Sequence, residues 1–149
     1  MHPFDIKTAL LAKHAQHVVL IHFPIALFMM GVLFDLVAYR TKNHGMAAAA
    51  YYNLLAAAIS TVPVLVTGVV AWQWALEGEK LKGILLLHLV LACASSVLIW
   101  IVSWVHFRAN RKAGLPLPMY RLPMELLTAA LVVLTGHLGG FLSGVNIPN

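Results

Sequence analysis

Four long apolar stretches with almost no charge constrain this fold more than any other feature of the chain. They cover residues 18–39, 51–76, 83–107 and 123–143 of a 149-residue sequence. Each reaches the ~20 residues that an α-helix needs to cross ~30 Å of hydrocarbon. Lipid offers the backbone no hydrogen bonds, so a spanning segment must satisfy its own N–H and C=O groups, as a helix does. We therefore predict an all-α integral membrane protein with four transmembrane helices.

The composition agrees with this prediction. Hydrophobic residues make up 61 % of the chain and charged residues only 10 %, whereas a soluble domain carries about 25 % charged residues. The connections are short (RTKNHGMAAAA at 40–50, EGEKLKG at 77–83, RANRKAGLPLPMYRLP at 108–123), which favours an up-down antiparallel four-helix bundle. The three prolines of the last connection disfavour a regular helix there. We expect an N-terminal segment, 1–16, with a short interfacial helix over 5–16, followed by a four-span domain, 17–149.

The basic residues are unevenly distributed between the two predicted membrane faces. Six lie on one face (Arg40, Lys42, Arg108, Arg111, Lys112, Arg121), and four lie on the other beside most of the acidic residues (Lys7, Lys13, Lys80, Lys82). The positive-inside rule places the first group in the cytoplasm, so both termini face outward. The net charge of +5 then suits contact with anionic lipid, and we expect no nucleic acid partner.

Histidines recur at one depth in this predicted topology. The sequence HVVLIHFPIAL (17–27) begins the first span with two histidines that a simple membrane anchor does not need. His22, His88 and His137 fall at about the same level on three spans near the outer face, and His17 lies about one and a half turns above His22. One buried histidine is more often a core residue bonded to a carbonyl. Three at one level favour a functional role, because ionisable residues inside a membrane are costly.

The surroundings of this histidine level favour a haem over other metal groups. Imidazole binds iron, copper and zinc, but Cys93 points elsewhere and Asp35 lies about 20 Å further along the first span. Haem iron needs only two axial ligands from facing helices. The chain has no CxxCH sequence for covalent attachment, which leaves haem b.

The predicted ligands are all four of these histidines. We expect one haem b, or two, with His22 and His88 as the preferred axial pair and His137 with His17 as the second pair. Four glycines near this level are predicted to leave room for the flat macrocycle: Gly68, Gly136, Gly139 and Gly140.

The motifs resemble a known family. HVVLIHFPIAL, Asp35, Thr-Gly at 67–68, LLLHLVLA around His88 and the ending GHLGGFLSGV are similar to the four-span bacterial membrane family called domain of unknown function twenty-two thirty-one. Its signature resembles HPxxVHFPIAL and GGxLVYxxGV, and the likeness covers roughly residues 17–146. Val18 stands where the family usually has proline, and the ending lacks the usual tyrosine. The resemblance implies a small protein of the bacterial inner membrane with a redox link, since such modules occur beside c-type cytochrome segments.

Two functions fit the sequence. In the first, the chain is a b-type cytochrome-like subunit that transfers electrons between a periplasmic cytochrome c and quinone or a larger membrane redox complex. In this case the chain is not itself an enzyme. The sequence shows no nucleophile accompanied by a general base and a third residue that orients the base. In the second, the chain is a haem-free assembly or proton-conducting transport subunit, in which Asp35 acts with Asn53 or Glu125 at its level. Both hypotheses about function remain open at this point.

Overall fold

The computed structural model describes residues 15–111 and 117–144, and these form helices and no strand. The helices are α2 (Ala15–Leu20), α3 (His22–Thr41), α4 (His44–Ala75), α5 (Gly83–Arg111) and α6 (Arg121–Leu142). Four segments are long and apolar enough to cross a membrane: Gln16–Thr41, His44–Trp74, Gly83–Arg111 and Arg121–Leu142. The predicted all-α, four-span class is confirmed. The predicted interfacial helix falls almost entirely outside the described residues.

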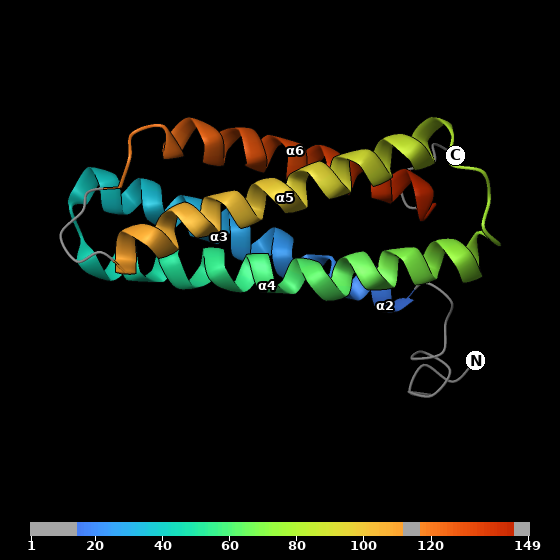
Figure 1. Cartoon of the computed structure of the whole chain (residues 1–149), viewed down its shortest axis with the longest axis horizontal. Helices are drawn as coiled ribbons and strands as arrows, with labels where there is room; N and C mark the ends of the chain where they lie inside the picture. Colours follow the sequence, from blue (N-terminus) through green and yellow to red (C-terminus); the bar gives the residue numbers. More distant parts are fainter. Residues whose placement is uncertain (1–14, 112–116, 145–149) are drawn as a thin grey trace.

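The four spans run up and down, as Figure 1 shows. α3 packs against α4, α4 against α5, α5 against α6 and α6 against α3, so that α3 and α5 stand diagonally across the bundle. We call the end that holds His17 and His88 the histidine end, where α2 and α5 begin and α4 and α6 finish (right in Figure 1). The opposite end, which carries Arg40, Arg111 and Arg121, is the basic end.

The first span lacks one helical hydrogen bond, one turn before Pro24. Proline has no N–H for the carbonyl four residues earlier, here Leu20, and its ring crowds that carbonyl. α2 and α3 meet at Ile21, which keeps helical backbone angles (φ −58°, ψ −27°). α2, which carries His17, packs mainly against α4.

Two helices begin earlier than the sequence predicted. α4 begins at His44 because Asn43 caps it: the Asn43 side chain accepts a hydrogen bond from the Met46 N–H at 3.1 Å, and the alanines that follow are strong helix formers. α6 begins at Arg121, which places Pro123 in its first turn. A proline is tolerated there because N–H groups of the first turn have no partner within the helix.

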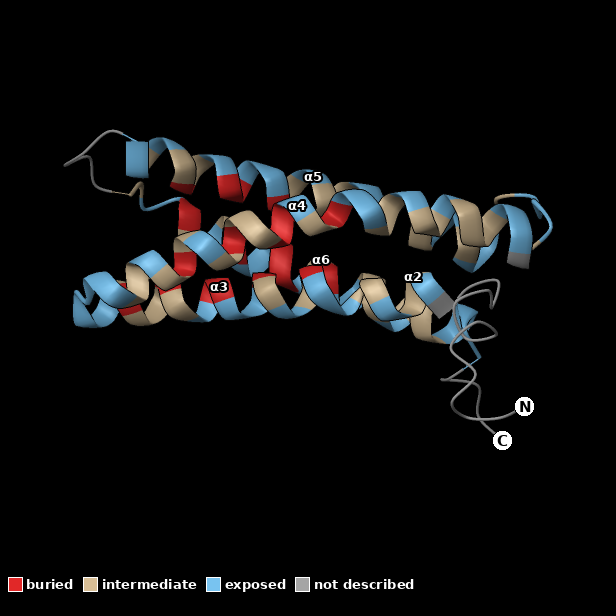
Figure 2. Cartoon of the chain, turned by 90° about the horizontal axis from the view of Figure 1, so that it is seen from below, coloured by how far each residue is buried: buried red, intermediate tan, exposed pale blue. Residues whose placement is uncertain are grey.

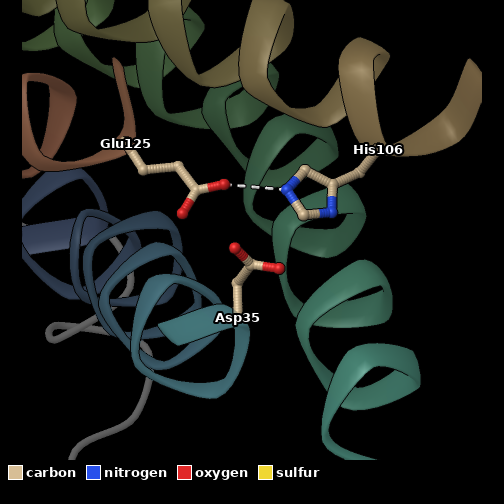
Figure 3. A group of neighbouring side chains, drawn as sticks. All are labelled: Asp35, His106 and Glu125. Atoms are coloured by element: carbon tan, nitrogen blue, oxygen red, sulfur yellow. Dashed lines mark hydrogen bonds and ion pairs between the residues drawn. The ribbon is translucent and has the colours of Figure 1, made fainter. Parts of the chain in front are cut away.

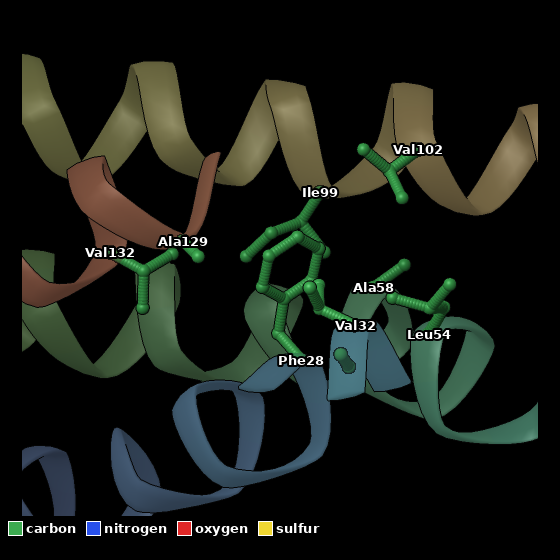
Figure 4. Close-up of a cluster of buried hydrophobic side chains, with 9 residues drawn as sticks. Phe28, Val32, Leu54, Ala58, Ile99, Val102, Ala129 and Val132 are labelled. Atoms are coloured by element: carbon green, nitrogen blue, oxygen red, sulfur yellow. The ribbon is translucent and has the colours of Figure 1, made fainter. Parts of the chain in front are cut away.

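The buried apolar core lies in the middle of the bundle and towards the basic end (Figure 4). It joins all four spans through nine residues: Phe28, Val32, Leu54, Ala57, Ala58, Ile99, Val102, Ala129 and Val132. Gly31 allows α3 to approach α4 closely, since a Cβ there would stand 2.8 Å from two side-chain carbons of Leu54.

Large apolar side chains are exposed along the outside of every span. Val62, Val66 and Val69 on α4 and Val97 and Trp104 on α5 are each more than half exposed. A soluble protein rarely shows so much contiguous apolar surface. On a protein with four membrane-length helices, this surface faces lipid acyl chains, and the chain is a multi-pass membrane protein.

Candidate functional site

His17 packs against α4 at the histidine end. Its ring is half-buried, and its Nδ1 lies 3.3 Å from the Thr67 hydroxyl oxygen. Thr67 itself donates to the carbonyl of Pro63 at 2.8 Å, so its oxygen is left to accept a hydrogen bond. This arrangement favours the His17 tautomer with the proton on Nδ1 and a lone pair on Nε2.

Gly68 makes room for the His17 ring. A Cβ at position 68 would stand 3.1 Å from Cε1 of His17, tighter than ordinary van der Waals contact. The glycine therefore lets the imidazole lie directly against the backbone of α4, as expected for a glycine that admits a flat group.

His88 repeats the same arrangement between α5 and α6. Its half-buried ring places Nδ1 3.1 Å from the backbone carbonyl oxygen of Thr135. A carbonyl oxygen can only accept, so Nδ1 carries the proton and Nε2 keeps its lone pair. Gly139 lies under this ring, because a Cβ there would stand 3.3 Å from Cε1 of His88.

His17 and His88 lie at the same end of the bundle although 71 positions separate them in the sequence. Each imidazole is held against a neighbouring helix, His17 against α4 and His88 against α6. Both therefore present an unprotonated Nε2 while Nδ1 donates to a protein oxygen. This is the arrangement of metal-ligating histidines, whose second nitrogen is held by a carbonyl or another oxygen.

The interior around this pair is packed less tightly than the rest of the bundle. Figure 2 shows the buried residues gathered away from the histidine end. Among described residues, Pro24 is the only buried one in the parts of the spans nearest that end (16–27, 62–75, 83–94 and 133–144). The chain's own side chains thus close the bundle at the basic end and leave it more accessible around His17 and His88.

The other predicted site residues lie elsewhere on this end. His22 is exposed, and its Nδ1 is 3.4 Å from the carbonyl of Val19 on its own segment. His137 is exposed and meets the ring of Phe141 edge-on at 5.0 Å.

The remaining predicted glycines are half-buried on α6. Gly136 is in ordinary contact range of Ile25, whose Cδ1 would be 3.8 Å from a Cβ at position 136. Gly140 lies one turn further along the same helix. Neither is placed against an imidazole as Gly68 and Gly139 are.

A second polar cluster lies near the basic end, and the sequence indicated only part of it. Asp35 of α3 accepts a hydrogen bond from Arg121 Nε of α6 at 2.8 Å, and His106 Nε2 of α5 lies 2.8 Å from Glu125 Oε1 of α6. All four side chains are at most 5 % exposed. Figure 3 shows Asp35, His106 and Glu125 pointing toward one another.

The sequence predicted Glu125 at the level of Asp35, but it placed Arg121 among the basic residues of the predicted cytoplasmic face and did not indicate His106. Asn53, the other residue predicted at this level, instead donates to the carbonyl of Ala49 on its own helix at 2.9 Å. One sequence feature could have indicated this cluster. Arg121 and Glu125 are four residues apart, which places them on the same face of one helix.

The comparison with family models identifies the class of protein. The chain matches the family described as predicted membrane protein (DUF2231) over residues 13–145. It therefore belongs to this family, as the motifs around His17, His22 and His88 predicted. No curated protein matches the chain, and no solved structure does.

Proposed function

We propose that this protein is a haem b-binding electron-transfer subunit and that His17 and His88 are the two axial ligands. One observation carries the proposal. Two imidazoles, from α2 and α5, lie at the same end of the bundle, and each donates Nδ1–H to an oxygen of the neighbouring helix. Each therefore keeps Nε2 available for a metal.

The residues around this pair fit a haem better than a bare metal ion. A structural zinc or copper site usually takes four protein ligands, and the described residues offer only this imidazole pair here. A haem brings four nitrogen ligands and needs two more from the protein. When bound, it supplies one-electron redox chemistry. Thr67 and Thr135 then hold the imidazole tautomers, and Gly68 and Gly139 let both rings lie close to the backbone.

This proposal changes the ligand pair expected from the sequence. His22 with His88 was preferred there, and His17 with His137 was assigned to a second haem. The exposed position of His22 and its contact with Val19 favour His17 as the partner of His88. A single haem suffices, since His137 contacts the exposed ring of Phe141.

The proposed membrane orientation follows from the charges. With the basic end in the cytoplasm of a bacterial inner membrane, the histidine end and both termini face the periplasm. Lys80 and Lys82 are exposed at that end, where they suit an acidic patch on a periplasmic electron donor or acceptor. We propose quinone or a larger membrane redox complex as the other partner.

The ligand assignment is tested with four single variants purified in mild detergent after expression with ample haem. We expect His17→Ala and His88→Ala each to lose most of the haem counted by the pyridine haemochrome assay. His22→Ala and His137→Ala are matched controls from the same end and should keep it. Size-exclusion elution identifies variants that fold. Full haem content in a folded His17→Ala or His88→Ala protein would refute the assignment.

A further inference from the structure

The cluster near the basic end has more polar groups than a structural salt bridge needs. Asp35 and Arg121 already form a complete pair, with Nε 2.8 Å from Oδ2. Packing three helices together requires no further acid. Yet Glu125, which is fully buried, adds a second carboxylate, and His106 adds an imidazole from the third helix.

Glu125 is also incompletely satisfied. Its Oε1 meets His106, but its Oε2 is buried and has no hydrogen-bond partner within the described part of the chain. An unsatisfied buried acceptor costs about 1–3 kcal/mol, and a charged one more. Buried polar groups of this kind call for a missing partner, either a water or an ion.

We propose that Asp35, His106 and Glu125 bind one divalent transition-metal ion, such as Zn²⁺, at the junction of α3, α5 and α6. Each residue offers a ligand atom, and these three atoms lie within 4.8 Å of one another. Ligands held about 2.0–2.2 Å from a tetrahedral Zn²⁺ are about 3.3–3.6 Å apart. The most widely separated of the three side chains therefore need to close by about an ångström.

The charge and the donor types favour such an ion. With neutral His106, two carboxylates and one guanidinium give the cluster a formal charge of −1, which attracts a cation. Mixed imidazole and carboxylate donors suit Zn²⁺, Fe²⁺ or Mn²⁺, whereas Mg²⁺ and Ca²⁺ prefer oxygen alone. Arg121 holds one oxygen of Asp35 and leaves the other carboxylate oxygen to the ion, an outer-shell role common around metal sites.

Metal binding must displace a proton. The 2.8 Å contact between His106 and Glu125 is a hydrogen bond, so one proton lies between the two groups. A metal that takes both residues as ligands displaces this proton, which moves to Nδ1 of a neutral His106. Further protonation of His106 or Glu125 competes with the metal, so the affinity falls as the pH is lowered. This inference does not depend on haem binding, because the two sites share no residue.

The test is titration of untagged, metal-stripped protein with Zn²⁺ by calorimetry in two buffers of different ionisation enthalpy. We expect one strongly bound Zn²⁺ per chain and, with His106 neutral, little net release of protons to the buffer. Glu125→Gln keeps the size of the side chain and should weaken binding more than about tenfold. His44→Gln is the matched control, since it removes an exposed histidine at the same end, and the His17→Ala, His88→Ala double variant removes the other histidine pair. Both should bind as the wild type does.

A second measurement covers the possibility that Glu125→Gln does not fold. Wild-type protein loaded with Mn²⁺ and labelled with ¹⁵N-histidine should show one directly bound imidazole nitrogen by pulsed electron paramagnetic resonance. Absence of stoichiometric metal binding by the wild type would overturn the proposal. So would equal affinity in folded Glu125→Gln, or loss of binding in either control.

Discussion

The buried pair of Asp35 and Arg121 gives the sharpest prediction about stability. Asp35→Asn keeps the shape of the side chain and removes its charge, which leaves the Arg121 guanidinium buried without its hydrogen-bonded counter-ion. The remaining oxygens near Arg121 are the carbonyls of Leu117 and Pro118, at 3.5 and 3.4 Å, too long to replace a 2.8 Å charged hydrogen bond.

The expected cost follows from this geometry. Removing one partner of a buried ion pair costs about 3–5 kcal/mol. The asparagine oxygen can still accept from Nε, so we expect the lower value, about 3 kcal/mol, or more than about 100-fold in the unfolding equilibrium constant. The double variant Asp35→Leu, Arg121→Met removes both charges at similar total volume and should lie within about 1.5 kcal/mol of the wild type.

The assay is unfolding of metal-stripped protein by increasing mole fractions of sodium dodecyl sulfate in mixed micelles, followed by circular dichroism. The reasoning is refuted if Asp35→Asn lies within about 1 kcal/mol of the wild type, the range expected of an exposed ion pair. It is also refuted if the double variant is as unstable as the single one, because the cost would then not come from an unpaired charge.

Two glycine substitutions test helix packing and the imidazole site separately. Gly31→Ala should destabilise the protein by about 1–3 kcal/mol in the same assay, because its Cβ would stand 2.8 Å from the Leu54 side chain. Gly136→Ala, whose nearest contact is at 3.8 Å, should be tolerated. Equal destabilisation by the two substitutions would contradict this account. Gly68→Ala should lower the haem content of the purified protein by pushing the His17 ring aside, while Gly136→Ala keeps it; unchanged haem in folded Gly68→Ala would count against the proposed site.

The spans were predictable because length and apolarity alone decide whether a helix can cross lipid. The depth of His88 was predictable for the same reason, since depth follows from counting residues at 1.5 Å each. The sequence did not predict which of the two histidines of the first span, His17 or His22, lies against a neighbouring helix. His17 and His22 are about 140° apart on a regular helix, so they cannot both turn to one site, and the sequence does not show which of the two turns inward.

The basic-end cluster was hidden for a different reason. Arg121 and His106 lie where a span meets the interface, and there a charged residue is ordinarily solvated. Their burial depends on contacts between helices distant in sequence, as between Asp35 and Arg121, 86 positions apart. Sequence patterns report the face of one helix but not which residues of other helices meet it.

The absorption spectrum of the purified wild-type protein tests the central proposal most directly. We would express the chain with ample haem, purify it in mild detergent, record oxidised and dithionite-reduced spectra, and count haem with the pyridine haemochrome assay. The proposed ligation by His17 and His88 predicts one haem b per chain and the sharp reduced α-band of a six-coordinate low-spin haem. A folded, colourless protein would contradict it and leave the histidine pair as a contact between helices or part of a proton path.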